Sequence, residues 1–140
     1  KQFAYLAAFI PVIMGMGGNI GTQSSTIVVR GLATGRIDIR EIWSVVSKEL
    51  TIGLILGLTY GLIIGAVAQL AFGKLALAVS VCGAVLSSMS VAALVGSLVP
   101  MVFAKINVDP AVATGPFVTT AIDVISVFFY FMIASSLLGL

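Results

Sequence analysis

Long apolar runs separated by short polar segments dominate this sequence. A helix that crosses a bilayer needs roughly 20 mostly apolar residues, and four runs reach that length: residues 3–29, 50–72, 75–104 and 111–140. Strands of a membrane β-barrel are shorter and alternate between apolar and polar residues. The pattern therefore predicts an all-α, polytopic transmembrane helix bundle, with residues 1–140 forming a single domain.

The composition supports a membrane domain. Hydrophobic residues make up 60% of the chain and charged residues 9%, whereas a soluble domain carries about 25% charged residues. The net charge of +2 is too small to suggest a nucleic-acid partner. Cys82 is the single cysteine, lies in an apolar run and is interpreted as a packing residue. Because the sequence begins at Lys1 without a signal-peptide pattern, we expect it to be an internal fragment.

The connections between the runs predict the orientation of the chain. Their basic residues are Arg30, Arg36, Arg40 and Lys48 in the first connection, Lys74 in the second and Lys105 in the third. Cytoplasmic loops are enriched in Lys and Arg, so the first and third connections are expected to face the cytoplasm. In the first connection, the helical spacing of the apolar residues and the presence of Trp43 predict a short amphipathic helix over residues 37–49.

Small residues predict close contacts between the helices. Four glycines in the second run are each four residues apart, namely Gly53, Gly57, Gly61 and Gly65. This spacing lets two helices approach closely, and the partner is either in the same chain or in a second copy. Prolines are expected to distort two other runs, since Pro11 permits a break in the first and Pro100 kinks the third.

The first run also carries a predicted polar face. Asn19, Gln23 and Thr26 follow one another at i, i+4 and i+7, with Thr22 beside them. Buried amides and hydroxyls need hydrogen-bond partners or water. This face therefore either joins helices through hydrogen bonds or lines an aqueous path.

Asp123 is the residue that indicates a function most directly. It lies inside the apolar stretch 117–140, which contains no Lys, Arg or His. A carboxylate at membrane depth costs at least a few kcal/mol and usually marks an ion or proton path. Thr119, Ser126 and Tyr130 share its helical face. The alternative interpretation is a protonated Asp123 that is hydrogen-bonded to its neighbours.

Two prolines shape the predicted start of the fourth span. Asp109 followed by Pro110 matches a helix N-cap with proline at the first helical position, which is a structural explanation for Asp109. Pro116 is predicted to lie inside the helix, where its missing N–H leaves the carbonyl of Val112 without a partner.

The available donor atoms favour a hard cation. The chain has no His and one Cys, which leaves zinc and copper without their preferred ligands. Oxygen ligands suit magnesium, which keeps several of its waters and uses one or two carboxylates. Two chains related by a two-fold axis would supply two Asp123 carboxylates, whose charge balances a divalent cation. An enzyme is not expected, because no nucleophile–base pair is evident either.

Several segments, taken in order, resemble the MgtE family of magnesium channels and transporters. They are residues 17–26 with Pro11 and Arg30 on either side, residues 48–49, residues 94–96 with Pro100, residues 108–111, and Pro116 with Thr120 and Asp123. The resemblance implies a homodimeric transmembrane domain of five helices, of which this chain provides helices two to five. It also implies magnesium transport by a multi-pass protein of the plasma membrane, which we expect to be a prokaryotic inner membrane.

The resemblance further implies roles for individual residues. The aspartate that matches Asp123 binds hydrated magnesium in the central pore, one from each subunit. The positions matching Asp109 and Glu49 are candidates for secondary cation sites near the cytoplasmic face. The candidate pore-lining residues are Asn19, Thr22, Gln23, Gly115 and Thr119. Because some members carry Asn at the positions of Thr22 and Gly115, the gate or the selectivity is expected to differ here.

The family leaves the mode of transport open. Many members carry a cytosolic magnesium-sensing region with a pair of CBS domains, which closes the pore when magnesium is plentiful. Eukaryotic relatives are proposed to exchange magnesium for sodium. The resemblance therefore implies a channel, with an exchanger or a broader divalent-cation transporter of the same fold as the alternative. The expected partners are a second copy of the chain, the lipid bilayer and divalent metal ions.

Overall fold

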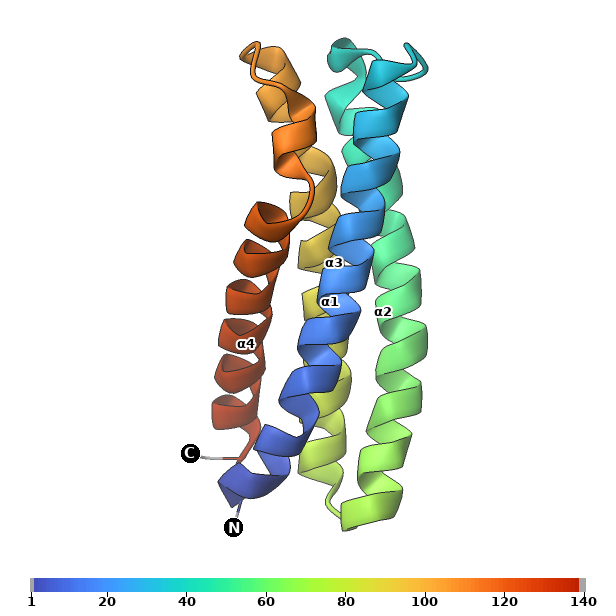
Figure 1. The fold of residues 1–140 in the computed structure, drawn as a ribbon. Coiled ribbons are helices and arrows are strands. Elements are labelled where there is room, and N and C mark those ends of the chain that lie inside the picture. The colour runs from blue at the N-terminus through green and yellow to red at the C-terminus, as the bar shows by residue number, and fades with distance from the viewer. Residues whose placement is uncertain (1, 139–140) are drawn as a thin grey trace.

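The computed structural model describes residues 2–138 and, within them, the side chains of residues 5–137. This part of the chain is helical and contains no strand. Its long helices are α1 (Gln2–Ala33), α2 (Ile42–Phe72), α3 (Leu75–Lys105) and α4 (Pro116–Leu138), and its short 3-10 helices are η1 (Ile39–Glu41) and η2 (Pro110–Ala113) (Figure 1). Four of these segments are long and apolar enough to cross a membrane. The predicted all-α bundle with four spans is therefore confirmed.

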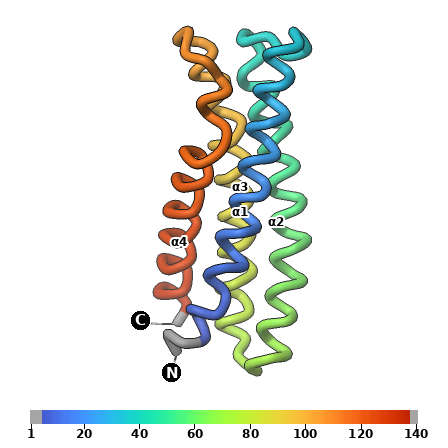
Figure 2. Tube along the Cα trace, viewed as in Figure 1, coloured from blue at the N-terminus to red at the C-terminus, as the bar shows by residue number. Residues whose placement is uncertain are grey.

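The connections lie at two opposite ends of the bundle. The turn between α2 and α3 shares one end with the start of α1 and the end of α4, and the connections that contain η1 and η2 share the other (Figure 2). The first and third connections thus meet at the same end, as the distribution of basic residues predicts. Their cytoplasmic orientation stays a prediction. Residues 139–140, which belong to the predicted fourth span, lie outside the described residues.

Helix α3 forms the centre of the bundle and packs against the other three long helices. Its buried side chains include Val81, Ala84, Val85 and Ala92, each fully shielded from solvent. Ser25 on α1 adds a polar contact at the end of the bundle, because its hydroxyl donates a hydrogen bond of 3.0 Å to the carbonyl of Ala113. Bilayer lipid offers few partners to such groups, so hydroxyls of this kind bind neighbouring helices.

The glycine ridge of α2 packs against α3 of the same chain. A Cβ atom on Gly61 would lie 2.8 Å from the carbonyl oxygen of Cys82, and a Cβ atom on Gly65 would lie 3.0 Å from that of Ala78. All four ridge glycines are buried. The opposite face of α2 is apolar and exposed, with Leu70 87% exposed, as expected for a surface in contact with lipid.

The fourth span is divided into two helices, which corrects the prediction of one continuous helix over residues 111–140. Asp109 caps η2, and its Oδ1 accepts a hydrogen bond of 2.9 Å from the backbone N–H of Ala111. The chain then turns at Gly115, whose φ of +81° favours glycine. Pro116 is the first residue of α4 and not an interior residue, because proline suits the first position of a helix.

The prolines inside the other long helices do not end them. Helix α1 runs through Pro11 without a break, and α3 continues through Pro100, where a kink stays a prediction. The amphipathic helix predicted over residues 37–49 leads into the second span but is not a short element of its own, because α2 begins at Ile42 and continues to Phe72. No proline lies between these two residues to end the helix. Trp43, in the first turn of α2, is 76% exposed.

Candidate functional site

An open groove lies between α1 and α4 and contains most of the candidate pore residues. Its volume is about 250 Å³. The lining residues are Met14, Gly15, Gly18, Asn19 and Thr22 from α1, with Thr119 and Asp123 from α4. The structure thus brings four of the predicted site residues together, although they come from opposite ends of the sequence.

Asp123 is the one charged residue among those that line this groove. Its side chain is partly buried, whereas Asn19 and Thr22 are exposed on the surface of the single chain. Among the residues that the structure describes, no hydrogen-bond donor and no cation pairs with the Asp123 carboxylate. A neutral Asp123 would instead donate from its own O–H to an acceptor, and this alternative interpretation stays a prediction.

The first turn of α4 orients Thr119 and Asp123. The backbone N–H and the hydroxyl of Thr119 both donate to the carbonyl of Gly115, at 3.1 and 3.0 Å. The hydroxyl oxygen of Thr119 therefore keeps its acceptor capacity for a ligand or a water in the groove. Asp123 lies one turn further along the same face, roughly 10 Å beyond Pro116. The site is thus built on a regular helix whose start is fixed by the turn at Gly115.

Glycines allow α1 to approach α4 closely beside the groove. A Cβ atom on Gly21 would overlap the side chain of Ile122, and a Cβ atom on Gly17 would overlap the hydroxyl of Ser88. Gly18 faces the groove itself, where a Cβ atom would lie 3.8 Å from Oδ1 of Asp123. The absence of side chains at Gly17 and Gly21 therefore lets α1 pack closely against α3 and α4.

The groove uses a different face of α1 from the predicted one. Gly15, Gly18, Asn19 and Thr22 are spaced i, i+3, i+4 and i+7, which is a single helical face. The predicted face ran instead through Asn19 and Gln23 to Thr26. Met14, Gly15 and Gly18 were not predicted, and the same helical spacing was the signal that could have found them.

Gln23 and Gly115, two predicted pore residues, do not line this groove. Each step along a helix turns the side chain by about 100°, so Gln23 is directed away from the position of Thr22. Gln23 is exposed, and the backbone of Gly115 forms the turn before α4. A pore-lining role for either residue stays a prediction for the assembled protein.

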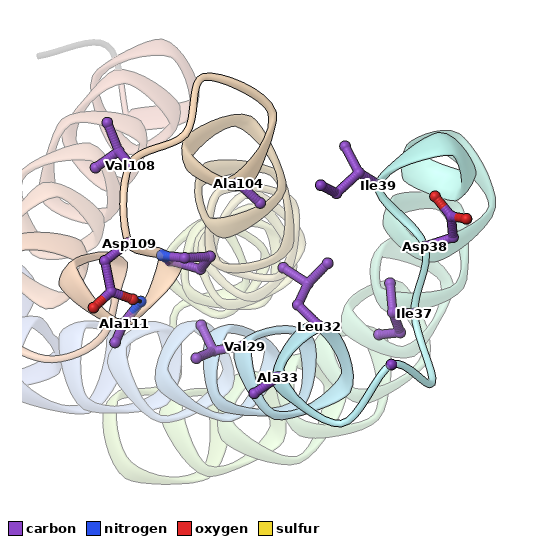
Figure 3. A pocket seen from close by; sticks show the side chains of 12 residues that line it. Val29, Leu32, Ala33, Ile37, Asp38, Ile39, Ala104, Val108, Asp109 and Ala111 are labelled. Atoms are coloured by element: carbon purple, nitrogen blue, oxygen red, sulfur yellow. Dashed lines mark hydrogen bonds between the residues drawn. The ribbon is translucent and has the colours of Figure 1, made fainter.

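A second, larger cavity lies at the end of the bundle that holds η1 and η2. Its volume is about 630 Å³, and ten of its twelve lining residues are uncharged and mostly apolar. Asp38 and Asp109 stand at opposite sides of this cavity (Figure 3). Each carboxylate also caps its own 3-10 helix through a backbone N–H at 2.9 Å. Both aspartates therefore have a structural role here.

Glu49 and Asp109, the two candidates for secondary cation sites, have different surroundings in the single chain. Glu49 is 5% exposed, and its Oε2 accepts a hydrogen bond of 2.8 Å from the hydroxyl of Ser24. It does not line the cavity that contains Asp109. The cause is that Glu49 lies on the face of α2 that packs into the bundle, whereas Asp109 is on the connection before α4. A cation role for each carboxylate stays a prediction.

The described residues contain no group of three or more His, Cys, Asp or Glu side chains that could hold a metal ion. The groove nevertheless combines a carboxylate with amide and hydroxyl oxygens in a segment of membrane-spanning character. Chemically, it can attract a cation and hydrogen-bond the waters around it.

Comparison with known proteins gives consistent matches along the chain. Residues 10–133 match the family model MgtE, described as a divalent cation transporter. Proteins named magnesium transporter MgtE are 32% identical in Bacillus subtilis, 37% identical in Thermus thermophilus and 41% identical in Enterococcus faecalis. These matches cover 97%, 95% and 96% of this chain. The chain spans 30%, 29% and 30% of the three relatives.

Proposed function

We propose, since this chain belongs to the MgtE family of divalent cation transporters, that it forms part of a protein that carries magnesium ions across a membrane. The observation that carries this proposal is the position of the Asp123 carboxylate. Asp123 belongs to a helix that is long and apolar enough to span a membrane, and its side chain lines the open groove between α1 and α4. An ionised carboxylate at such a depth is costly unless a cation accompanies it. A transported cation would supply the counter-charge to this carboxylate, because it would pass the carboxylate on its way across the membrane.

The residues that line the groove support recognition of a hydrated ion, because they combine one carboxylate with an amide and two hydroxyl groups. Magnesium binds six ligands and gives up its waters reluctantly. Asp123 would therefore act through water, while Asn19, Thr22 and Thr119 offer further hydrogen-bond partners to the hydration shell.

A pore formed by two chains would complete the charge balance. One Asp123 provides a single negative charge to the groove, and two symmetry-related copies would provide two. Exposed polar groups on a membrane helix also need partners, and a second chain facing Asn19 and Thr22 would enclose a wet path. We therefore propose a homodimer in which paired Asp123 carboxylates recognise the ion.

Magnesium uptake into proteoliposomes tests this proposal. The full-length protein and its Asp123→Asn variant are compared at a fixed membrane potential, with Glu41→Gln as the control because Glu41 is an exposed carboxylate outside the groove. We expect Asp123→Asn to abolish selective uptake and Glu41→Gln to retain it. Normal, selective uptake by a folded Asp123→Asn variant would overturn the assignment and identify Asp123 as a structural residue.

The same preparation distinguishes a channel from an exchanger. A channel carries magnesium current without a sodium gradient, whereas a sodium–magnesium exchanger stops when sodium is removed from both sides. We expect current that persists in the absence of sodium. Uptake that depends on a sodium gradient would indicate an exchanger instead of a channel. Asp123 would remain the proposed recognition site in that case.

A further inference from the structure

The polar face of α4 divides into two parts with different surroundings. Thr119 and Asp123 line the groove, where Asp123 is partly buried. Ser126 and Tyr130, further along the same face, are 1% and 0% exposed. One half of the face is therefore available to an ion, and the other half lies inside the bundle.

Ser126 takes part in a polar contact that joins three helices. Its hydroxyl oxygen lies 2.6 Å from that of Ser88 on α3, and either hydroxyl can be the donor. The Ser88 hydroxyl also lies 3.3 Å from the carbonyl oxygen of Ile13 on α1, within hydrogen-bonding distance. Ser88 is 1% exposed. This contact is thus shielded from both lipid and water.

The close approach at Gly17 makes this contact possible. A Cβ atom on Gly17 would overlap the Ser88 hydroxyl and lie 2.9 Å from the Ser126 hydroxyl. Any side chain on Gly17 would therefore separate α1 from the serine pair. The contact occupies space that the sequence leaves open by placing glycine at this position.

The position of α4 depends on contacts of this kind. The turn at Gly115 separates α4 from η2, so the preceding helix does not dictate its rotation. Much of the surrounding interface is apolar, as at Val118 and Ile122, and apolar contacts are not directional. A hydrogen bond requires a narrow range of distance and angle. The serine pair therefore specifies a rotation and a height for α4 that apolar packing alone does not.

We propose that Ser126, held by Ser88, is a positioning residue that directs the Asp123 carboxylate into the groove. Ser126 follows Asp123 by three residues, which is about one helical turn. A rotation or shift of α4 that breaks the serine contact moves Asp123 relative to Asn19 and Thr22. This inference rests on the proposed function, in which Asp123 recognises the transported ion.

The test measures magnesium uptake by the full-length protein in proteoliposomes as a function of magnesium concentration. The variants are Ser126→Ala, Ser88→Ala and their combination. Ser80→Ala is the matched control, because Ser80 is a fully buried serine of α3 whose hydroxyl donates to Ala76 in its own helix at 2.7 Å. Thermal unfolding of each variant is recorded in parallel.

Loss of the serine contact is expected to raise the magnesium concentration for half-maximal uptake by roughly two- to tenfold. This range corresponds to the net free energy of one hydrogen bond. Discrimination between magnesium and calcium should fall with it. The double variant should be no worse than Ser88→Ala, because that substitution already removes the serine contact together with the bond to Ile13. Ser80→Ala should leave both quantities unchanged.

Unchanged half-saturation and selectivity in folded Ser126→Ala and Ser88→Ala variants would overturn the inference. Effects that add in the double variant would also overturn it, since they would show two independent roles. If Ser126→Ala does not fold, Ser88→Ala tests the same contact from a helix that does not line the groove. An Asp123→Asn sample in the same series separates the two proposals, because normal uptake by that variant would refute the proposed function itself.

Discussion

Gly18 on α1 faces the carboxylate of Asp123 on α4. A Cβ atom on Gly18 would stand 3.8 Å from Oδ1 of Asp123 and 3.7 Å from Cγ2 of Thr119. These are ordinary van der Waals distances, so the fold has room for a methyl group at this position. The space nevertheless adjoins the carboxylate oxygen that a hydrated ion would approach. Gly18 therefore links the packing of α1 to the chemistry of the groove.

Gly18→Ala is expected to reduce magnesium uptake by at least roughly tenfold without unfolding the protein. The methyl group would exclude a water that hydrogen-bonds the Asp123 carboxylate, and a hydrogen bond to a charged group contributes about 1.5–3 kcal/mol. Stability should stay equal or rise slightly, because alanine is a better helix former than glycine. Uptake in proteoliposomes and thermal unfolding measure the two effects separately.

Gly15→Ala provides the control for this substitution. Gly15 lines the same groove, but a Cβ atom there would meet nothing within 4 Å. The same chemical change at Gly15 should therefore leave uptake close to that of the unmodified protein. Equal losses at the two glycines would contradict a specific role for Gly18 and would indicate a general narrowing of the groove.

The main features of the fold follow from one-dimensional signals in the sequence. Apolar runs predict four spans, and the basic residues predict that the first and third connections share one end of the bundle. Asp123 is isolated among apolar residues, and this isolation marks it as a candidate site residue without any knowledge of which residues lie near it in space. Such signals depend on length and composition, which tertiary contacts do not alter.

Features that depend on contacts between helices do not follow from such signals. The rotation of α1 follows from the approach of Gly21 to Gly96 on α3, and that approach directs Gly15 and Gly18 into the groove in place of Gln23. The break before α4 likewise depends on the backbone conformation of Gly115. The apolar pattern of the sequence continues through Gly21 and Gly115. It therefore predicts neither the rotation of α1 nor the break before α4.

Tyr130→Phe is expected to destabilise the bundle by about 1 kcal/mol. The Tyr130 hydroxyl donates a hydrogen bond of 2.9 Å to the carbonyl of Leu6, and its side chain is 0% exposed. Removing the hydroxyl loses the net contribution of one hydrogen bond while preserving the aromatic ring. Thermal unfolding in detergent measures the change. Tyr60→Phe is the control, since Tyr60 is 42% exposed, and an equal loss there would contradict the prediction.

Gly61→Ala is expected to destabilise the packing of α2 on α3 by about 1–3 kcal/mol. The added Cβ atom would lie 2.8 Å from the backbone carbonyl of Cys82, which cannot move without shifting α3. Gly83→Ala is the matched control, because a Cβ atom there would lie 3.7 Å from the side chain of Ile133. A lower unfolding temperature for Gly61→Ala alone is the expected outcome. Equal temperatures for both variants would mean that the two helices separate at little cost.

Ser24→Ala is expected to destabilise the protein by about 1–3 kcal/mol, because it removes a hydrogen-bond donor from a buried carboxylate. The Ser24 hydroxyl lies 2.8 Å from Oε2 of Glu49, and the two residues are 3% and 5% exposed. Ser97→Ala controls for the loss of a buried hydroxyl, since Ser97 donates to the carbonyl of Ala93 in its own helix at 2.7 Å.

A double-mutant cycle with Glu49→Gln tests whether charge strengthens this contact. Glutamine keeps an acceptor oxygen for Ser24 but has no charge, and hydrogen bonds to neutral groups contribute less than those to charged groups. Ser24→Ala should therefore cost less in the Glu49→Gln background than in the unmodified protein. Equal costs in the two backgrounds would contradict an ionised Glu49 in the folded state. The charged form is also the form that a cation site near this end of α2 requires, so the cycle measures a precondition for that role independently of transport.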